Sequence, residues 1–211
     1  MRMPQIVKRF GADGIADFVL HTGSHGQRAA LFSDDTQMTL FTARGITRCP
    51  ADLNMLESIE KAYLDWYGTQ KGTAMSCSIY GLAEMPELNE RRAPGNTCLS
   101  ALNSIEHGRE ADNDSKGCGG VMRVAPIAVF MSRTGSLEQD AAKVAGEAAK
   151  ITHKHPLGYL PAALMSYIIY GLMRSATPDA NLMTELAHSG CDLLGTLYAL
   201  SLIHISEPTR H

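Results

Sequence analysis

The sequence predicts an all-α fold, a single compact domain of several packed helices. Alternating runs of β-branched and aromatic residues, which are typical of strands, are scarce, whereas apolar residues recur at helical spacing along most of the chain. The chain has 211 residues, 45% of them hydrophobic and 19% charged, so it is long enough to bury one full hydrophobic core. Stretches that contain Gly and Pro separate the periodic segments and predict loops between the helices.

The periodic apolar pattern defines six expected helices: 36–47, 52–67, 97–107, 137–150, 161–173 and 181–200. The first two each carry a broad apolar stripe, and the third ends before Gly108, a common helix terminator. The fourth is rich in Ala. The fifth is apolar nearly all round, which predicts a buried central helix. We expect long loops at 80–95 and 110–120, and such loops often carry binding groups.

The composition argues against several classes of function. The net charge of −3 disfavours nucleic acid as a partner, because phosphate binding requires a basic face. No apolar run is long enough to span a bilayer and no signal-peptide segment follows the first residues, so no membrane partner is expected. The five cysteines are widely spread and form no CxxC pair, which predicts reduced thiols. We therefore expect a cytoplasmic protein.

The clearest chemical motif is Ser33-Asp34-Asp35-Thr36, which lies at the start of the first expected helix. One hydroxyl and two carboxylates supply the oxygen ligands that Mg²⁺ prefers. Two neighbouring carboxylates also repel each other unless a cation lies between them. The alternative is a helix N-cap, since Ser, Asp and Thr are preferred capping residues, and on composition alone the cap is the commoner case.

A second segment, 114–126, has Gly117, Gly119 and Gly120 at three of four successive positions. Glycines let backbone N–H groups approach a ligand, and a helix start just afterwards suits a phosphate. The segment is neither a P-loop nor a dinucleotide fingerprint, because Lys116 precedes the glycines and no strand leads in. A plain glycine-rich turn between helices explains it equally well.

A third segment, 152–156, contains His153 and His155. Two histidines at positions i and i+2 do not share a helix face, so a two-histidine zinc site is not expected. One of them can hydrogen-bond a ribose or a phosphate, although a helix-terminal histidine that contacts backbone carbonyls is the commoner case. Upstream, 91–99 predicts a turn before the third helix, with Asn96 or Thr97 as its cap.

In their order along the chain, these segments resemble the ADP-ribosylglycohydrolase family. The family's Ser/Thr-Asp-Asp-Thr hallmark is matched at 33–36, and the similarity continues at 94–97, 117–126 and 152–156, up to about Ala199. Several collinear motifs are more specific than one, and a metal ligand can also cap its helix. The resemblance implies an all-α fold of that type and magnesium-dependent hydrolysis of the glycosidic bond between ADP-ribose and a protein side chain.

The resemblance also implies roles for individual residues. Two Mg²⁺ ions are expected, held in part by Ser33, Asp34 and Asp35. The loop around the diphosphate and ribose is expected to consist of Ser115, Lys116, Gly117, Cys118 and Gly119, with His153 or His155 lining the same cleft. Asp34 or Asp35 is a candidate for proton transfer, although a metal-bound carboxylate is a poor base.

The sequence departs from the family pattern at both ends. The family's N-terminal helix with its catalytic acid and its closing Asp-x-Asp-Thr motif have no match, so we expect 1–199 to be a truncated and inactive part of the domain. Residues 200–211 resemble a translated sequencing adapter and are expected to be non-native. Two other functions are kept as alternatives: a non-catalytic ADP-ribose-binding or structural protein, and a hydrolase of an ADP-ribose-containing small molecule.

Overall fold

The computed structural model describes residues 3–22, 26, 28–73 and 80–198. The chain divides into two compact units, Met1–Phe32 and Ser33–His211. Every segment that carries a candidate site residue belongs to the second unit. The tail expected to be non-native, 200–211, lies outside the described residues.

The first unit contains a short helix and a small hairpin. The helix α1 (Met3–Phe10) buries none of its residues. The strand β1 (Leu20–Thr22) pairs antiparallel with β2 (Arg28–Ala30), so that Leu20 lies opposite Ala30. The sequence predicted none of these elements, because strands of three residues are too short for an alternating pattern to be recognised.

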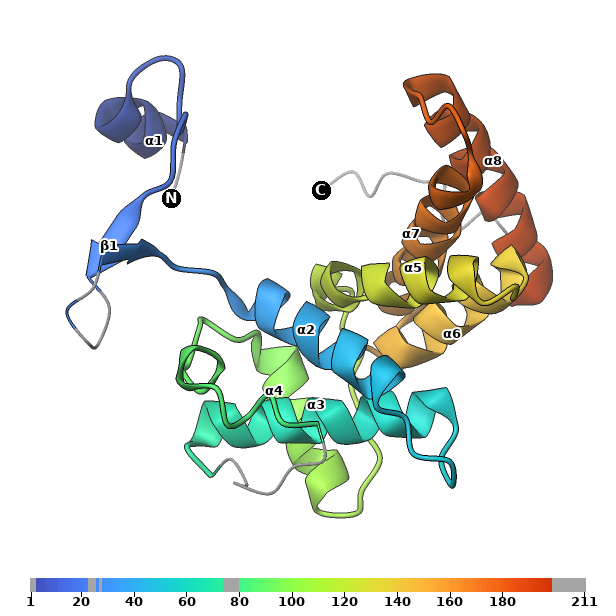
Figure 1. Cartoon of the computed structure of the whole chain (residues 1–211), viewed down its shortest axis with the longest axis horizontal. Coiled ribbons are helices and arrows are strands. Elements are labelled where there is room, and N and C mark those ends of the chain that lie inside the picture. The colour runs from blue at the N-terminus through green and yellow to red at the C-terminus, as the bar shows by residue number, and fades with distance from the viewer. Residues whose placement is uncertain (1–2, 23–25, 27, 74–79, 199–211) are drawn as a thin grey trace. The chain divides into compact units, whose positions relative to one another are not determined.

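The second unit is built from α-helices, which confirms the predicted all-α fold (Figure 1). Its α-helices are α2 (Asp34–Thr47), α3 (Met55–Lys71), α4 (Asn96–Glu106), α5 (Ala125–Arg133), α6 (Glu138–Lys150), α7 (Pro156–Arg174) and α8 (Ala180–Leu197). Two short 3₁₀-helices, η1 (Pro86–Leu88) and η2 (Cys118–Arg123), lie in the long loops. The helix α5 was not among the six expected helices, because its nine residues are too few for a clear apolar period.

Capping chemistry shifts α3 along the chain relative to the predicted 52–67. Asn54 and Glu57 form a capping box, in which each side chain accepts the backbone N–H of the other residue. At the other end, Gly72 adopts a left-handed conformation that terminates the helix. The apolar stripe alone therefore located α3 correctly but not its ends.

The start of α7 also differs from the predicted 161–173. Pro156 occupies the first turn, where the missing N–H of proline is tolerated, and the helix continues through Pro161. The apolar pattern of the sequence indicates only 161–173, although an internal proline removes one helical hydrogen bond. Pro161 lies on the exposed side of α7, while its neighbours Leu160 and Ala162 are buried and hold the helix in place through the proline.

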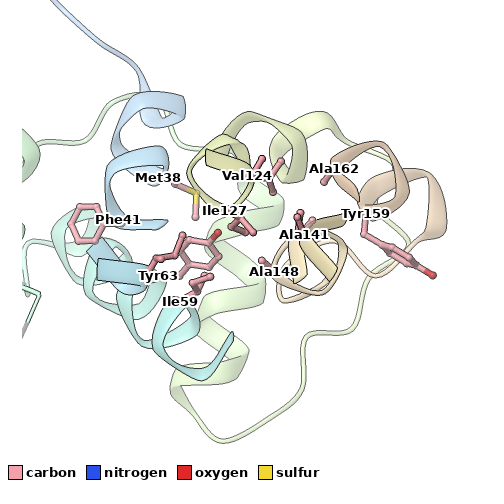
Figure 2. Packing of buried hydrophobic residues seen from close by; sticks show 14 of the residues in the cluster. Met38, Phe41, Ile59, Tyr63, Val124, Ile127, Ala141, Ala148, Tyr159 and Ala162 are labelled. Carbon is pink, nitrogen blue, oxygen red and sulfur yellow. The ribbon is translucent and has the colours of Figure 1, made fainter. Parts of the chain in front are cut away.

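The core of the second unit joins α2, α3, α5, α6 and α7. Figure 2 shows Met38 and Phe41 of α2 beside Ile59 and Tyr63 of α3, with Ile127 of α5 close by. Burying each large apolar side chain contributes about 1.5–3 kcal/mol to stability before entropy is subtracted. The core therefore fixes α2, whose first turn carries the acidic motif, against the rest of the unit.

The contact between α6 and α7 depends on small side chains. The buried face of α6 consists of Ala141, Ala142, Ala145, Ala148 and Ala149. Small residues let two helix backbones approach closely, and α7 contributes the buried residues Ala162 and Ala163 to its contacts with the core. The connection from α6 to α7, which carries both candidate histidines, is consequently short and firmly held.

By length and composition alone, α7 is apolar enough to cross a membrane, which corrects the expectation that the chain has no such run. In this structure, however, α7 packs against α5, α6 and α8 and buries Tyr159, Ser166 and Tyr170. Its contacts are those of a core helix within the second unit, as its nearly continuous apolar character predicted.

Candidate functional site

The acidic motif lies at the first turn of α2. Ser33 is the N-cap residue and has extended backbone geometry, yet its side chain makes no capping hydrogen bond. Instead, the Ser33 hydroxyl donates to Oδ2 of Asp35 at 2.6 Å. The capping alternative therefore explains the position of Ser33 but not the use of its side chain, which leaves the hydroxyl and the exposed carboxylate of Asp35 side by side.

Asp34 is the buried member of the pair, with 9% of its surface exposed. Its Oδ2 accepts a hydrogen bond from the backbone N–H of Gly95 at 3.3 Å. Burial raises the pKa of Asp34; the Gly95 hydrogen bond opposes this shift, and the neighbouring charge of Asp35 adds to it. A bound cation would offset both unfavourable effects on the ionised carboxylate.

The loop that precedes α4 is fastened to the first two turns of α2. The backbone N–H of Asp34 donates to the carbonyl of Arg92 at 3.0 Å. Gln37, which is fully buried, donates through Nε2 to the carbonyls of Leu88 and Glu90 at 3.1 and 2.8 Å. A buried amide that is satisfied in this way fixes the loop, and it does so next to the acidic motif.

The cap predicted for the third helix is wrong. Gly95 is the N-cap residue of α4, Asn96 is the first helical residue, and no side chain caps this end. The backbone N–H of Gly95 is engaged by Asp34 across the chain. Thr97 likewise contacts another segment, because its Oγ1 lies 3.1 Å from Oγ of Ser115.

The glycine-rich loop is held through Ser115. The Oγ atom of this residue contacts Thr97 and also accepts the backbone N–H of Gly117 at 3.3 Å, which closes a tight turn. Lys116, Gly117 and Cys118 are exposed, so their backbone and the lysine ammonium are open to a ligand. The residues 115–119 thus form a surface loop whose base is fixed by two hydroxyl contacts.

His153 packs beneath this loop with only 2% of its surface exposed. A Cβ atom added at Gly119 would lie 3.0 Å from Cε1 of His153, and one at Gly117 would lie 3.5 Å from Nε2. Glycine at position 119 therefore leaves the space that the imidazole fills. Burial, and then the positive charge of Arg123, lower the pKa of His153 to about 4, so the imidazole is neutral near pH 7.

His155 has a different environment. It is the N-cap residue of α7, and its Nδ1 accepts the backbone N–H of Leu157 at 3.0 Å. Its Nε2 lies 3.8 Å from Oδ1 of Asp114. The prediction of a helix-terminal histidine was correct in position, but the contact is with an N–H group rather than a carbonyl, because the histidine stands at the helix start. Of the two histidines, His153 is the one packed against the glycines.

Sequence reasoning missed Asn113, which joins the glycine loop to the histidine segment. Its Nδ2 donates to the carbonyl of Thr152 at 2.9 Å, and its Oδ1 accepts the backbone N–H groups of Ser115 and Lys154 at 3.2 and 3.3 Å. Asparagine often bonds the backbone two residues ahead, so the Asn113-Asp114-Ser115 sequence did carry a signal. The contacts to the histidine segment, in contrast, have no local signature.

Arg123 was also missed as a functional residue. It is fully buried at the end of η2 and donates to Oγ1 of Thr152 at 2.6 Å and to the carbonyl of Ala148 at 3.3 Å. Its guanidinium lies 4.3 Å from the ring centroid of Tyr63, a favourable cation–π distance. The sequence carried one signal for this residue, because Arg123 stands between the apolar residues Met122 and Val124. A charge that is buried with such neighbours requires specific partners.

The structure joins the candidate segments into one chain of contacts. Asp34 touches Gly95, Thr97 touches Ser115, and the glycine loop packs on His153. Among the described residues, no hydrogen bond links the two carboxylates directly to the loop, so the segment around Gly95 is the bridge. In the same part of the chain, no three His, Cys, Asp or Glu side chains gather into a metal-binding cluster.

A cavity of about 600 Å³ lies elsewhere in the second unit. It opens between the start of α3, the end of α4 and the end of α6, and its walls carry both acidic and basic side chains. None of the predicted site residues lines it. The cavity is therefore separate from the chain of contacts that joins the motifs.

The fold and the site together define a helical protein in which an acidic helix start and a glycine-rich loop share one polar region. The family model described as ADP-ribosylglycohydrolase matches residues 1–201, and the chain belongs to this family. The resemblance inferred from the motifs is thus confirmed, and with it a hydrolase type that acts on ADP-ribosylated substrates in general. A search of curated proteins gave no match.

Proposed function

We propose that this chain carries the substrate-binding core of a magnesium-dependent enzyme that removes ADP-ribose from modified protein side chains. The observation that supports this most directly is the pairing of a buried carboxylate, Asp34, with an exposed one, Asp35, at a helix start. Asp34 is tied through Gly95 to the segment that contacts the glycine loop. The acidic groups and the loop would then act on different parts of the same ligand.

The residues at the start of α2 fit magnesium by their chemistry. Ser33, Asp34 and Asp35 offer only oxygen atoms as ligands, and each carboxylate accepts a protein hydrogen bond at Oδ2. Magnesium commonly keeps several waters and binds through one or two protein carboxylates, so two carboxylates suffice for one ion. When bound, magnesium would supply Lewis-acid polarisation of the substrate's oxygens.

The chain's own groups have distinct tasks in glycosidic bond hydrolysis. The transition state resembles an oxocarbenium ion, and Asp34 and Asp35 would hold the magnesium ion whose Lewis acidity polarises the substrate's oxygens. The backbone N–H groups of the glycine loop and the ammonium of Lys116 bind the diphosphate. When ionised, Asp34 or Asp35 would also accept a proton during hydrolysis. We further propose that the enzyme acts in the cytoplasm.

The test is release of ADP-ribose from a mono-ADP-ribosylated protein, measured with Mg²⁺ and with a chelator on the chain completed with the family's acid-bearing N-terminal helix and its closing Asp-x-Asp-Thr motif. Removing the metal, or introducing Asp34→Asn together with Asp35→Asn, is expected to lower the release rate by roughly 100-fold or more. Asp140→Asn, an exposed change on α6, is the matched control and should leave the rate unchanged. Equal rates in all four conditions would exclude the proposed role of the acidic motif.

One observation favours a second candidate, a non-catalytic ADP-ribose-binding protein. The described residues supply two carboxylates at the site but no third acidic, histidine or cysteine ligand. Such a protein would bind ADP-ribose equally with and without Mg²⁺ and would release nothing from a modified protein. A free ADP-ribose-containing small molecule, tested beside the protein conjugate, separates the two possible substrate types.

A further inference from the structure

The hydroxyl of Thr152 connects the buried arginine to the candidate histidine. Its Oγ1 accepts a hydrogen bond from Nη2 of Arg123 at 2.6 Å and lies 2.9 Å from Nδ1 of His153. All three side chains are almost completely buried. Because a guanidinium only donates hydrogen bonds, Thr152 is the acceptor in the first contact, and its own hydrogen remains for one further acceptor.

Two acceptors lie within reach of that hydrogen, Nδ1 of His153 at 2.9 Å and the carbonyl of Ala149 at 3.5 Å. The Ala149 carbonyl already accepts the backbone N–H groups of Thr152 and His153 at 3.2 and 3.0 Å. These two bonds occupy both of its lone pairs. The hydroxyl hydrogen is therefore directed to Nδ1, and a neutral imidazole that accepts at Nδ1 carries its proton on Nε2.

The Nε2 atom faces the glycine loop. A Cβ atom added at Gly119 would lie 3.2 Å from it, and one at Gly117 would lie 3.5 Å away. Nε2 has no hydrogen-bond partner among the described residues. Nε2 is not among the fully buried unpaired polar atoms, so the small exposed part of the imidazole leaves this N–H open to an acceptor oxygen that approaches from the loop side, either water or a ligand.

Arg123 is itself held firmly enough to orient Thr152. Its Nη2 also donates to the carbonyl of Ala148, in the last turn of α6, and its guanidinium stacks on the ring of Tyr63. The carbonyl end of a helix favours a cation, and the planar guanidinium has a fixed donor geometry. The Arg123 side chain thus reaches from η2 to α6 and fixes the residue that precedes His153.

We propose that Arg123 and Thr152 are positioning residues that hold His153 in its Nε2–H tautomer, so that it donates to an oxygen of the ligand at the glycine loop. This rests on the proposed function in that the ligand oxygen belongs to a phosphate or hydroxyl of ADP-ribose. The histidine acts as a neutral hydrogen-bond donor, and the cation that orients it does not touch the ligand.

The first experiment measures the tautomer without any ligand. Long-range ¹H–¹⁵N NMR of the histidine-labelled full chain should show a protonated Nε2 and an unprotonated Nδ1 for His153, assigned by the signals lost in His153→Gln. In Thr152→Val both tautomers should appear, whereas Thr152→Ser should retain the wild-type pattern. A protonated Nδ1 in the wild-type protein would overturn the proposal, even if the Val variant failed to fold.

The second experiment measures binding of ADP-ribose by calorimetry. Thr152→Val should weaken the affinity by roughly threefold to tenfold, the value of one hydrogen bond, while Thr152→Ser stays within about twofold. Unchanged affinity in a folded Val variant would contradict the positioning role. If the wild-type protein shows the expected tautomer but binds no ADP-ribose, the proposed function fails while the tautomer assignment stands.

Discussion

Asp34 and His153 are both buried ionisable residues in the candidate site, but the charges around them are opposite. Burial favours the neutral form of each, so it raises the pKa of Asp34 and lowers that of His153. The neighbour of Asp34 is a second carboxylate, whereas the neighbour of His153 is the cation of Arg123. Burial alone therefore does not define what a site binds, because the adjacent charge decides whether the site favours a cation or an oxygen acceptor.

The largest expected effect comes from removing the cation on the histidine side. Arg123→Ala should lower the free energy of unfolding by about 3–5 kcal/mol, because it opens a cavity beside Tyr63 and removes the donor to Thr152. Arg123→Met fills most of that volume and should cost clearly less. Urea denaturation measures both, and equal losses in the two variants would show that the packing argument is wrong.

The next effect is the pH dependence that His153 contributes. Its pKa is lowered from 6.5 to about 4, so its contribution to stability is complete above pH 6.5 and is lost as the pH falls towards 4. His153→Gln should flatten the fall in stability over this window, measured by denaturation at several pH values. His188→Gln, an exposed change on α8, is the control and should leave the fall unaltered.

Asp34 should change the free energy of unfolding with pH in the opposite direction from His153. Its pKa is raised above 3.8, so the metal-free protein should lose stability as the pH rises through the folded-state pKa of this carboxyl group. Asp34→Asn should therefore stabilise the metal-free protein at pH 7, and this gain should disappear below pH 3.8. If the variant is destabilised at neutral pH instead, the charge of Asp34 is already compensated within the protein.

The smallest effect tests the space between the loop and the imidazole. Gly119→Ala would place a Cβ atom 3.0 Å from Cε1 of His153, so the ring must shift by a few tenths of an ångström. We expect about 1 kcal/mol of lost ADP-ribose binding. Gly117→Ala meets Ser115 at 3.3 Å and His153 at 3.5 Å and should lose less. A larger loss of ADP-ribose binding in Gly117→Ala than in Gly119→Ala would show that the imidazole does not lie closest to Gly119.

The parts of the fold that depend on contiguous residues were predictable from the sequence. The expected helix 36–47 became Asp34–Thr47, and 137–150 became Glu138–Lys150, because apolar periodicity identifies a helix that packs on one side. Errors arose at helix ends, where Asn54 and Glu57 form a capping box and where Pro156 rather than Pro161 begins α7. Capping and proline tolerance depend on neighbours that a periodic pattern does not contain.

The candidate site likewise has parts that the sequence predicts and parts that it does not. Ser33 to Thr36 and the glycines of 117–120 are short motifs, so their chemistry was recognisable in the chain itself. The contacts of Thr152 with Arg123 and Asn113 join residues 29 and 39 positions apart, and they exist only once the helices have packed. The tautomer of His153 follows from those distant contacts, which is why no local pattern indicated it.

The burial of Arg123 has a consequence for the order of folding. A guanidinium gives up its water only when other groups replace it, and here the replacements are carbonyls of α6 and the ring of Tyr63. Those groups take their places only after the last turn of α6 has formed and docked against α3. We therefore expect the ligand loop to assemble late in folding and to open first, exchanging its amide hydrogens faster than the helices that support it.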